Sequence, residues 1–125
     1  MREFVIQATH RPGEVGRAAN VLGKAGVNLK SVAAMAFGNQ GLIRILPDDV
    51  ETTRNALQQA NLRFEEHEVV TVLLENRAGE LAEMADKLAN AGINVHAFYL
   101  TGREGDLVEL AVIVDDPKKA KKLLE

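Results

Sequence analysis

The sequence predicts an α+β fold made of two similar units in tandem, and two observations lead to this prediction. First, residues 10–31 and 76–97 align at a constant offset of 66 with eight of 22 positions identical, where chance would give roughly one or two. Second, short runs of β-branched residues alternate in each copy with stretches whose apolar residues recur at helical spacing. The identical pairs are Arg11/Arg77, Gly13/Gly79, Glu14/Glu80, Ala19/Ala85, Leu22/Leu88, Ala25/Ala91, Gly26/Gly92 and Asn28/Asn94, and Asp48-Asp49 matches Asp115-Asp116 at offset 67. This period is too long for a solenoid and fits two small domains, which we place at residues 1–68 and 69–125.

The first copy is expected to contain a strand, a helix, two strands, a helix and a fourth strand. Pro12 suits the first turn of a helix that Gly26 ends, Asp49 suits the N-cap of the next helix, and Asn61 suits its left-handed stop. A hairpin turn is expected at 38–41 because Gly and Asn gather there. The expected elements are a strand at 4–6, a helix between 13 and 26, strands at 27–37 and 42–46, a helix at 50–60 and a strand at 62–67.

The second copy is expected to repeat this order without the final strand. Its expected elements are a strand at 69–74, a helix at 79–91, a strand at 93–100, a turn at 102–106, a strand at 107–114 and a helix that starts near Pro117. Because the last strand is missing, the second sheet has an unmatched edge that a neighbouring chain could fill. This favours a homodimer, although a shortened chain explains the missing strand equally well.

Composition limits the classes of function. The chain has 125 residues, 46% of them hydrophobic and 26% charged, which is ordinary for a globular protein. A single unit of roughly 60 residues is marginal alone, so we expect the copies to share a sheet, a core face or a partner chain. The net charge of −3 gives no reason to expect nucleic acid or anionic membrane as a partner. The start lacks the apolar region of a secretory signal, and the longest apolar run, 69–74, is too short to cross a bilayer, so we predict a soluble cytoplasmic protein.

Two β-α-β-β-α(-β) units, with antiparallel sheets and helices on one face, imply a ferredoxin-like architecture. The segment 76–79, Asn-Arg-Ala-Gly, opens a helix, and the segment 91–94, Ala-Gly-Ile-Asn, follows it. This pair of motifs resembles the ACT domain, a small-molecule sensing module of amino-acid metabolism. The first copy has matching motifs at 10–13 and 25–28, with the pattern's usual proline at Pro12, where the second copy has Ala78. The resemblance covers nearly the whole chain and extends to stand-alone tandem ACT proteins that carry no catalytic domain.

The helix-opening loops are the candidate ligand sites. A Gly-containing loop at a helix N-terminus presents free backbone N–H groups and a positive dipole end, which suits a carboxylate. The resemblance implies that the residue opening the loop and the Asn after the helix meet across a contact between two ACT units and hold an amino acid. The candidate ligand-binding residues are Asn76, Arg77, Ala78, Gly79 and Asn94 in the second copy, and His10, Arg11, Gly13 and Asn28 in the first. The second copy is favoured because it has Asn76 where the first has His10, although the same residue types also serve turns and caps without any ligand.

Metal binding and catalysis find little support. Cysteine is absent, and the three histidines have no metal-ligand spacing, so no metal or cofactor site is expected. No nucleophile elbow or phosphate-cradling loop occurs, and Ser31 is the only serine, so no catalytic residues are assigned. The RNA-recognition motif shares this element order, but it needs aromatic residues on its central strands and a basic surface. The net charge of −3 argues against such a surface, so we do not expect RNA binding.

The sequence therefore favours a non-catalytic regulatory sensor. It would bind an amino acid or similar small carboxylate, dimerise, and signal the bound state to a partner enzyme or regulator through ligand-dependent changes in ACT–ACT contacts. The alternative is a structural or interaction subunit that dimerises through its ACT units with empty loops. An enzyme is a third interpretation, for which the sequence offers no catalytic constellation.

Overall fold

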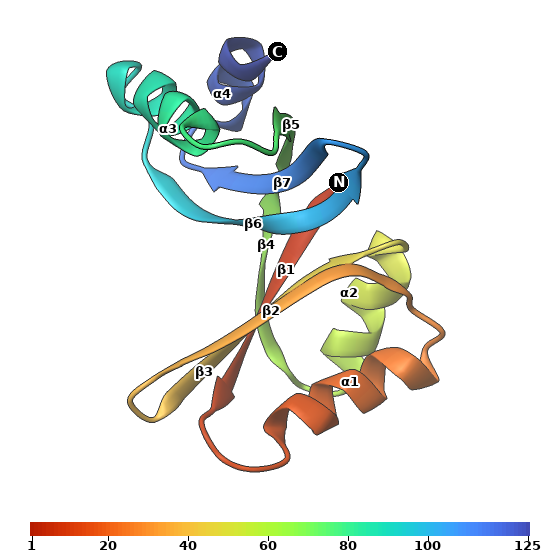
Figure 1. Ribbon diagram of the computed structural model, residues 1–125. Coiled ribbons are helices and arrows are strands. Elements are labelled where there is room, and N and C mark those ends of the chain that lie inside the picture. The colour runs from red at the N-terminus through yellow and green to blue at the C-terminus, as the bar shows by residue number, and fades with distance from the viewer. The chain divides into compact units, whose positions relative to one another are not determined.

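The computed structural model describes all of residues 1–125, which form seven strands and four helices (Figure 1). By its internal contacts the chain divides into two compact units. We call Arg2–His67 the first unit, and Glu68–Glu125 together with Met1 the second unit. None of the four helices has the length and apolar character that crossing a bilayer requires.

The first unit has a four-stranded sheet with the strand order β2-β3-β1-β4 and two helices on one face of it (Figure 1). Strand β3 pairs antiparallel with both β1 and β2. The core lies between sheet and helices, because apolar residues of β1 and β3 face Leu22 of α1 and Leu57 of α2. The elements are β1 Arg2–Thr9, α1 Glu14–Lys24, β2 Leu29–Phe37, β3 Gln40–Pro47, α2 Val50–Gln59 and β4 Arg63–Glu68.

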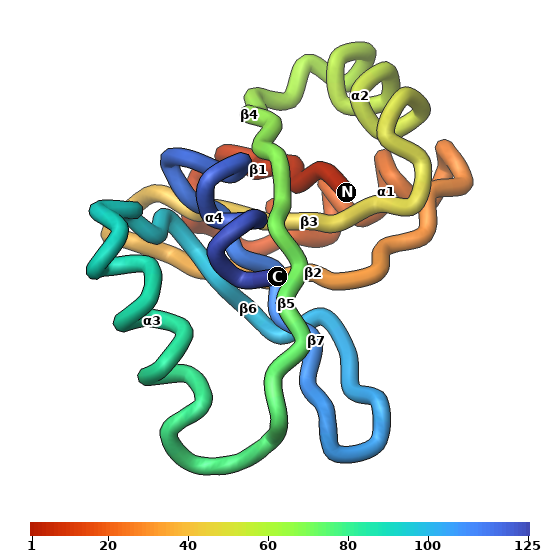
Figure 2. The backbone as a smooth tube through the Cα atoms, turned by 90° about the horizontal axis from the view of Figure 1, so that it is seen from above, coloured from red at the N-terminus to blue at the C-terminus, as the bar shows by residue number.

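The second unit has a three-stranded sheet with the order β5-β7-β6 and the helices α3 and α4. Both β5 and β6 pair antiparallel with β7, and the core joins them to Met84 and Leu88 of α3 and Ala120 of α4. No strand lies beside β5 in the position that β4 takes beside β1, as the sequence predicted. The elements are β5 Val70–Glu75, α3 Glu80–Asn90, β6 Val95–Glu104, β7 Leu107–Val114 and α4 Pro117–Leu124. Along the chain, only Val69 separates β4 from β5 (Figure 2).

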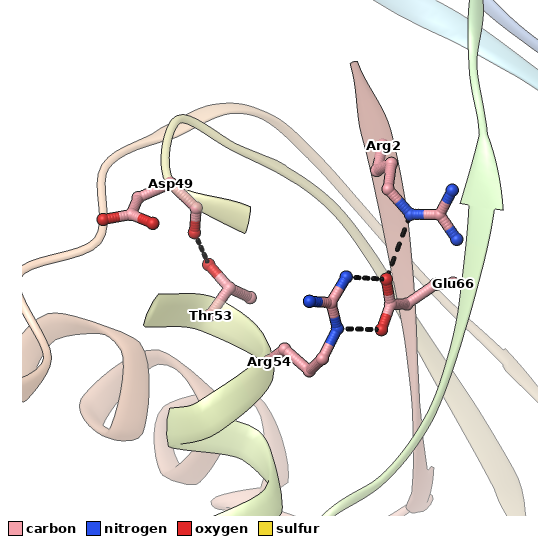
Figure 3. Close-up of polar contacts among 5 residues, drawn as sticks. All are labelled: Arg2, Asp49, Thr53, Arg54 and Glu66. Carbon is pink, nitrogen blue, oxygen red and sulfur yellow. Dashed lines mark hydrogen bonds and ion pairs between the residues drawn. The ribbon is translucent and has the colours of Figure 1, made fainter. Parts of the chain in front are cut away.

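The predicted helix boundaries follow from local capping chemistry. The Asp49 carboxylate accepts a hydrogen bond from the backbone N–H of Thr52 at 3.1 Å. Figure 3 shows the neighbouring bond, in which the Thr53 hydroxyl donates to the Asp49 carbonyl at 2.7 Å. Asp116 caps α4 in the same way, through the backbone N–H of Lys119 at 3.1 Å. Asn61 adopts a left-handed conformation with φ of 57°, which ends α2 as expected.

The second hairpin differs from the prediction. The sequence suggested a turn over 102–106, but β6 continues to Glu104 and only Gly105 and Asp106 form the turn. A register shift between Leu100 and Gly102 allows pairing with β7 to resume beyond it. The Thr101 hydroxyl also donates to the Glu109 carboxylate at 2.6 Å. Glycine at 102 therefore marks an irregularity inside the strand, a use of glycine that looks like a turn in the sequence.

Candidate functional site

The two helix-opening loops have the same backbone conformation. Gly13 and Gly79 are the N-caps of α1 and α3, and both have a φ of 91° in the left-handed region. A Cβ added at either glycine would meet no other atom within 4 Å. The conformation itself, rather than crowding, therefore requires glycine at both positions.

Each loop is tied to the tip of the hairpin in its own unit. The backbone N–H of His10 donates to the carbonyl of Asn39 at 2.7 Å, and the backbone N–H of Asn76 donates to that of Asp106 at 2.8 Å. The first loop residue is thus held in place through its backbone in both units. Because these bonds use only the backbone, the side chain can differ between the units, and it is His10 in the first and Asn76 in the second.

Each loop arginine is paired with a glutamate in the first turn of the following helix. Arg77 Nε lies 2.7 Å from a carboxylate oxygen of Glu80 and 2.9 Å from one of Glu75. The hydrogen bond that Arg77 donates to Glu80 and the negative charge of Glu75 raise the pKa of Arg77. Arg11 Nε lies 3.5 Å from a carboxylate oxygen of Glu14, so its pairing is much looser. A protein carboxylate thus already lies at each helix N-terminus. Arg11 has one carboxylate at 3.5 Å, whereas Arg77 has two within 2.9 Å.

Asn28 and Asn94 lie at the other end of these helices. Each follows the C-terminus of a helix of 11 residues, which spans about 16 Å, while the loops precede the N-terminus. Within one unit the structure therefore does not bring His10 near Asn28, or Asn76 near Asn94. A site made of a loop and an asparagine needs a contribution from another unit, as the ACT resemblance implied.

Both asparagines have aspartate partners that the sequence analysis did not assign. The Asp48 carboxylate accepts from the backbone N–H of Asn28 at 3.1 Å, and Asp115 accepts from that of Asn94 at 3.1 Å. The side-chain amide of Asn94 also donates to Asp115 at 3.3 Å. The repeated Asp-Asp pair in the sequence was the available signal: its first aspartate holds the asparagine, and its second caps the next helix.

A pocket of about 240 Å³ lies beside the first loop, in the first unit. Small and apolar residues make up most of it, with polar groups at one side. It is lined by Ala8, Thr9, His10, Arg11, Glu14, Val15, Ala34, Met35, Ala36, Gly41, Leu42 and Ile43. A polar cleft of about 510 Å³ shares Arg11 and Glu14 with this pocket and adds Arg17 and Arg63. The first loop thus borders both an apolar pocket and a cationic surface, which together suit a small carboxylate with an apolar part.

The hollows of the second unit have a different character. A trough of about 450 Å³ lies between α3 and β6, lined by Gly79 and by apolar residues that include Leu81 and Phe98. These two side chains are 45% and 47% exposed. Another groove, of about 810 Å³, follows the unpaired edge of β5 and the side of α4. Asn76 and Arg77 line neither hollow.

The structure holds no cluster of three or more histidine, aspartate or glutamate side chains arranged as metal ligands. His67 lies 3.5 Å from a carboxylate oxygen of Glu65, in an exposed pair on β4. The loops and the hollows beside them offer charged side chains and apolar surface.

Comparison with known proteins identifies the fold. No protein-family model matches the sequence, and no curated protein matches it. Among solved structures, protein BT0572 from Bacteroides thetaiotaomicron is similar with a TM-score of 0.86 at 19% identity, covering 98% of this chain and 85% of that chain. The regulatory subunit of aspartate kinase from Thermus flavus has a TM-score of 0.68 at 14% identity, with 98% and 89% covered. The ligand-free form of that subunit from Thermus thermophilus has a TM-score of 0.67 at 15% identity, with 98% and 88% covered. At these identities the likeness establishes the fold, and it agrees with the tandem ACT fold expected from the sequence.

Proposed function

We propose that this chain is a non-catalytic regulatory module that binds an amino acid or a similar small carboxylate. The observation that carries the proposal is the 240 Å³ pocket, which lies directly against a helix-opening loop and has Arg11 and His10 at its side. A cation and a helix N-terminus attract a carboxylate, and the apolar lining accepts the rest of a small ligand. The fold shared with regulatory subunits of aspartate kinase supports the same role.

The output of such a module is a change in how it contacts another protein. Ligand binding alters that contact only if the ligand has different affinities for the two arrangements. A site that needs both a loop and an asparagine from another unit has this property, because the ligand stabilises the assembled form. A cytoplasmic homodimer that signals to a partner enzyme or regulator, with domains at residues 1–68 and 69–125, is part of this proposal.

Thermal unfolding against a panel of the twenty amino acids and their 2-oxo acids tests the proposal. Small ligands gain at most about 1.5 kcal/mol per heavy atom, so we expect micromolar to millimolar affinity. A ligand at about 100 times its dissociation constant stabilises by roughly 2.7 kcal/mol, which raises the midpoint by several degrees. One ligand or a chemically related group should raise the midpoint, and a panel that leaves it unchanged at millimolar concentrations contradicts the proposal.

A structural or interaction subunit is the second candidate. It is favoured by the trough between α3 and β6, where Leu81, Val95 and Phe98 are 40–47% exposed. Exposed apolar residues gathered in one place are typical of surfaces that another protein covers. Under this alternative the panel gives no shift, while sedimentation or light scattering shows a dimer that Phe98→Ser disrupts.

A further inference from the structure

The sheet beneath the first loop carries an unbroken row of very small residues. Ala8 of β1 pairs with Gly41 of β3, and Gly41 pairs with Ala36 of β2. Partners in register lie on the same face of a sheet, and Ala8 shares that face with Ile6, which contacts the helices in the core. The row therefore faces the side on which α1 lies, and all three residues line the pocket.

The same row in the second unit consists of large residues. Leu74 of β5 pairs with Val108 of β7, and Val108 pairs with Arg103 of β6. Leu74 packs against the hydrophobic core of its unit. The two loops have the same backbone conformation, so the side chains beneath them account for the different hollows. The 240 Å³ pocket lies over the small residues of the first unit, whereas the trough that borders Gly79 in the second unit lies between α3 and β6.

The charges around the two loops also favour an anion at the first loop. Arg77 is held by two close carboxylates, whereas Thr9 in the first unit replaces Glu75 and leaves Arg11 with only the loose contact to Glu14 at 3.5 Å. A ligand carboxylate therefore finds a more available guanidinium in the first unit.

Two further positions near the loops are less acidic in the first unit than in the second. Arg17 of α1 aligns with Glu83 of α3, and Asn39 of the first hairpin aligns with Asp106 of the second. Arg17 and Asn39 both line the cationic cleft beside the first loop. In the second unit these positions are the acidic Glu83 and Asp106, and their negative charges repel an anion.

We propose that only the first unit binds the ligand, and that the ligand is a carboxylate with a compact apolar chain, such as a branched-chain amino acid or its 2-oxo acid. Its carboxylate faces Arg11, and its apolar chain lies over Ala8, Ala36 and Gly41. Glu14 lies at the side of the pocket and accepts from the ammonium group if the ligand is an amino acid. The second loop then keeps its shape for structural reasons alone. This inference rests on the proposed function and specifies its site, and it opposes our sequence-based preference for the second copy.

The test measures binding by calorimetry and by the thermal midpoint, with L-leucine, L-valine and 4-methyl-2-oxopentanoate as apolar probes. L-Lysine and L-aspartate are the polar comparators. We expect one or more apolar probes to bind at least tenfold more tightly than either comparator, because a charged chain has no partner over the alanine and glycine row. Glu14→Gln separates the two ligand classes: it weakens binding of the amino acids and leaves that of the 2-oxo acid unchanged or stronger.

Variants in the two units locate the site. Gly41→Val fills the pocket with the residue found in the second unit, and a Cβ at Gly41 has its nearest atoms at 3.7 and 3.8 Å, an ordinary contact distance. We expect Gly41→Val and Arg11→Gln each to weaken binding at least tenfold, while Arg77→Gln changes it less than twofold. If Gly41→Val lowers the midpoint of the free protein by more than a few degrees, Ala36→Leu narrows the pocket from the neighbouring strand and replaces it in the test.

The outcomes separate this inference from the proposed function. Binding that survives Gly41→Val and is lost in Arg77→Gln places the ligand in the second unit and overturns the inference alone. Tighter binding of lysine or aspartate than of the apolar probes overturns the ligand class. Absence of binding by every amino acid and 2-oxo acid overturns the proposed function as well.

Discussion

The guanidinium of Arg54 binds the carboxylate of Glu66 through two hydrogen bonds, Nε to Oε2 and Nη2 to Oε1, each 2.7 Å long (Figure 3). Arg2 adds a third, from Nε to Oε1, at 3.0 Å. The three residues come from α2, β4 and β1, and the Glu66 side chain is only 17% exposed. This cluster therefore fastens the edge strand β4 to a helix and to its neighbouring strand.

Arg54→Ala should destabilise the protein by about 1–3 kcal/mol, because it leaves a largely buried carboxylate with one charged partner. Urea unfolding measures the loss. Glu65→Gln on the same strand is the matched control, since that side chain is 63% exposed and its loss should cost less than about 0.5 kcal/mol. Equal losses in the two variants would contradict the role assigned to the cluster.

Stability should fall in acid partly through Glu66. Hydrogen bonds from Arg54 and then from Arg2 lower the pKa of Glu66 from its usual 4.5 to about 2. A carboxylate whose pKa is lower in the folded state stabilises the fold fully above its unfolded pKa, and this contribution is lost as pH falls from 4.5 toward 2. The free energy of unfolding should therefore drop by about 1–3 kcal/mol more in the wild type than in Glu66→Gln across that interval. Parallel pH profiles of the two proteins would show that Glu66 does not titrate in this way.

Asp49→Ala should cost roughly 1 kcal/mol by removing the N-cap of α2. The Asp49 carboxylate binds both the backbone N–H and the hydroxyl of Thr52, and these bonds lower its pKa. Asp86→Ala, at an exposed position inside α3, removes the same charge without a cap and should leave stability within about 0.5 kcal/mol. Chemical denaturation of both variants checks this, and a larger effect at Asp86 would exclude capping as the cause.

Gly13→Ala and Gly79→Ala should each destabilise by roughly 1–2 kcal/mol, since both positions have a φ of 91° and a Cβ is disfavoured there. Gly16→Ala, only three residues later, should stabilise by up to about 1 kcal/mol because Gly16 lies inside α1 with open space around it. Thermal unfolding distinguishes the two signs. A stabilising Gly13→Ala would mean that the loop does not adopt the left-handed conformation.

The fold was predictable from the sequence to the level of its elements. The helix caps at Asp49 and Asn61 follow from local chemistry, which acts over a few residues. The repeat and the missing last strand were predictable because the two copies can be aligned in the sequence. The extent of β6 was not predictable in this way, because Gly102 and Gly105 look alike in sequence. Only pairing with β7 decides that the first lies inside the strand and the second in the turn.

The candidate site was predictable only in part. His10, Arg11 and Gly13 were named from the helix-opening motif. In the structure His10 and Arg11 line a pocket, and Gly13 is the N-cap of α1. Asn28 and Asn94 were expected to reach a loop from another ACT unit, and within its own unit each lies a helix length from the loop. The sequence alone shows where a residue falls along the chain, and a helix places its two ends far apart.

Two copies of one small α+β unit could be predicted without a structure, because each segment carries its own pattern of apolar spacing and capping residues. The difference between the copies beneath their helix-opening loops appears only in the tertiary structure. Ala8, Ala36 and Gly41 are scattered along the chain, and strand register alone aligns them into one row beneath the first loop. A pocket forms there because three strands each contribute a side chain too small to fill it.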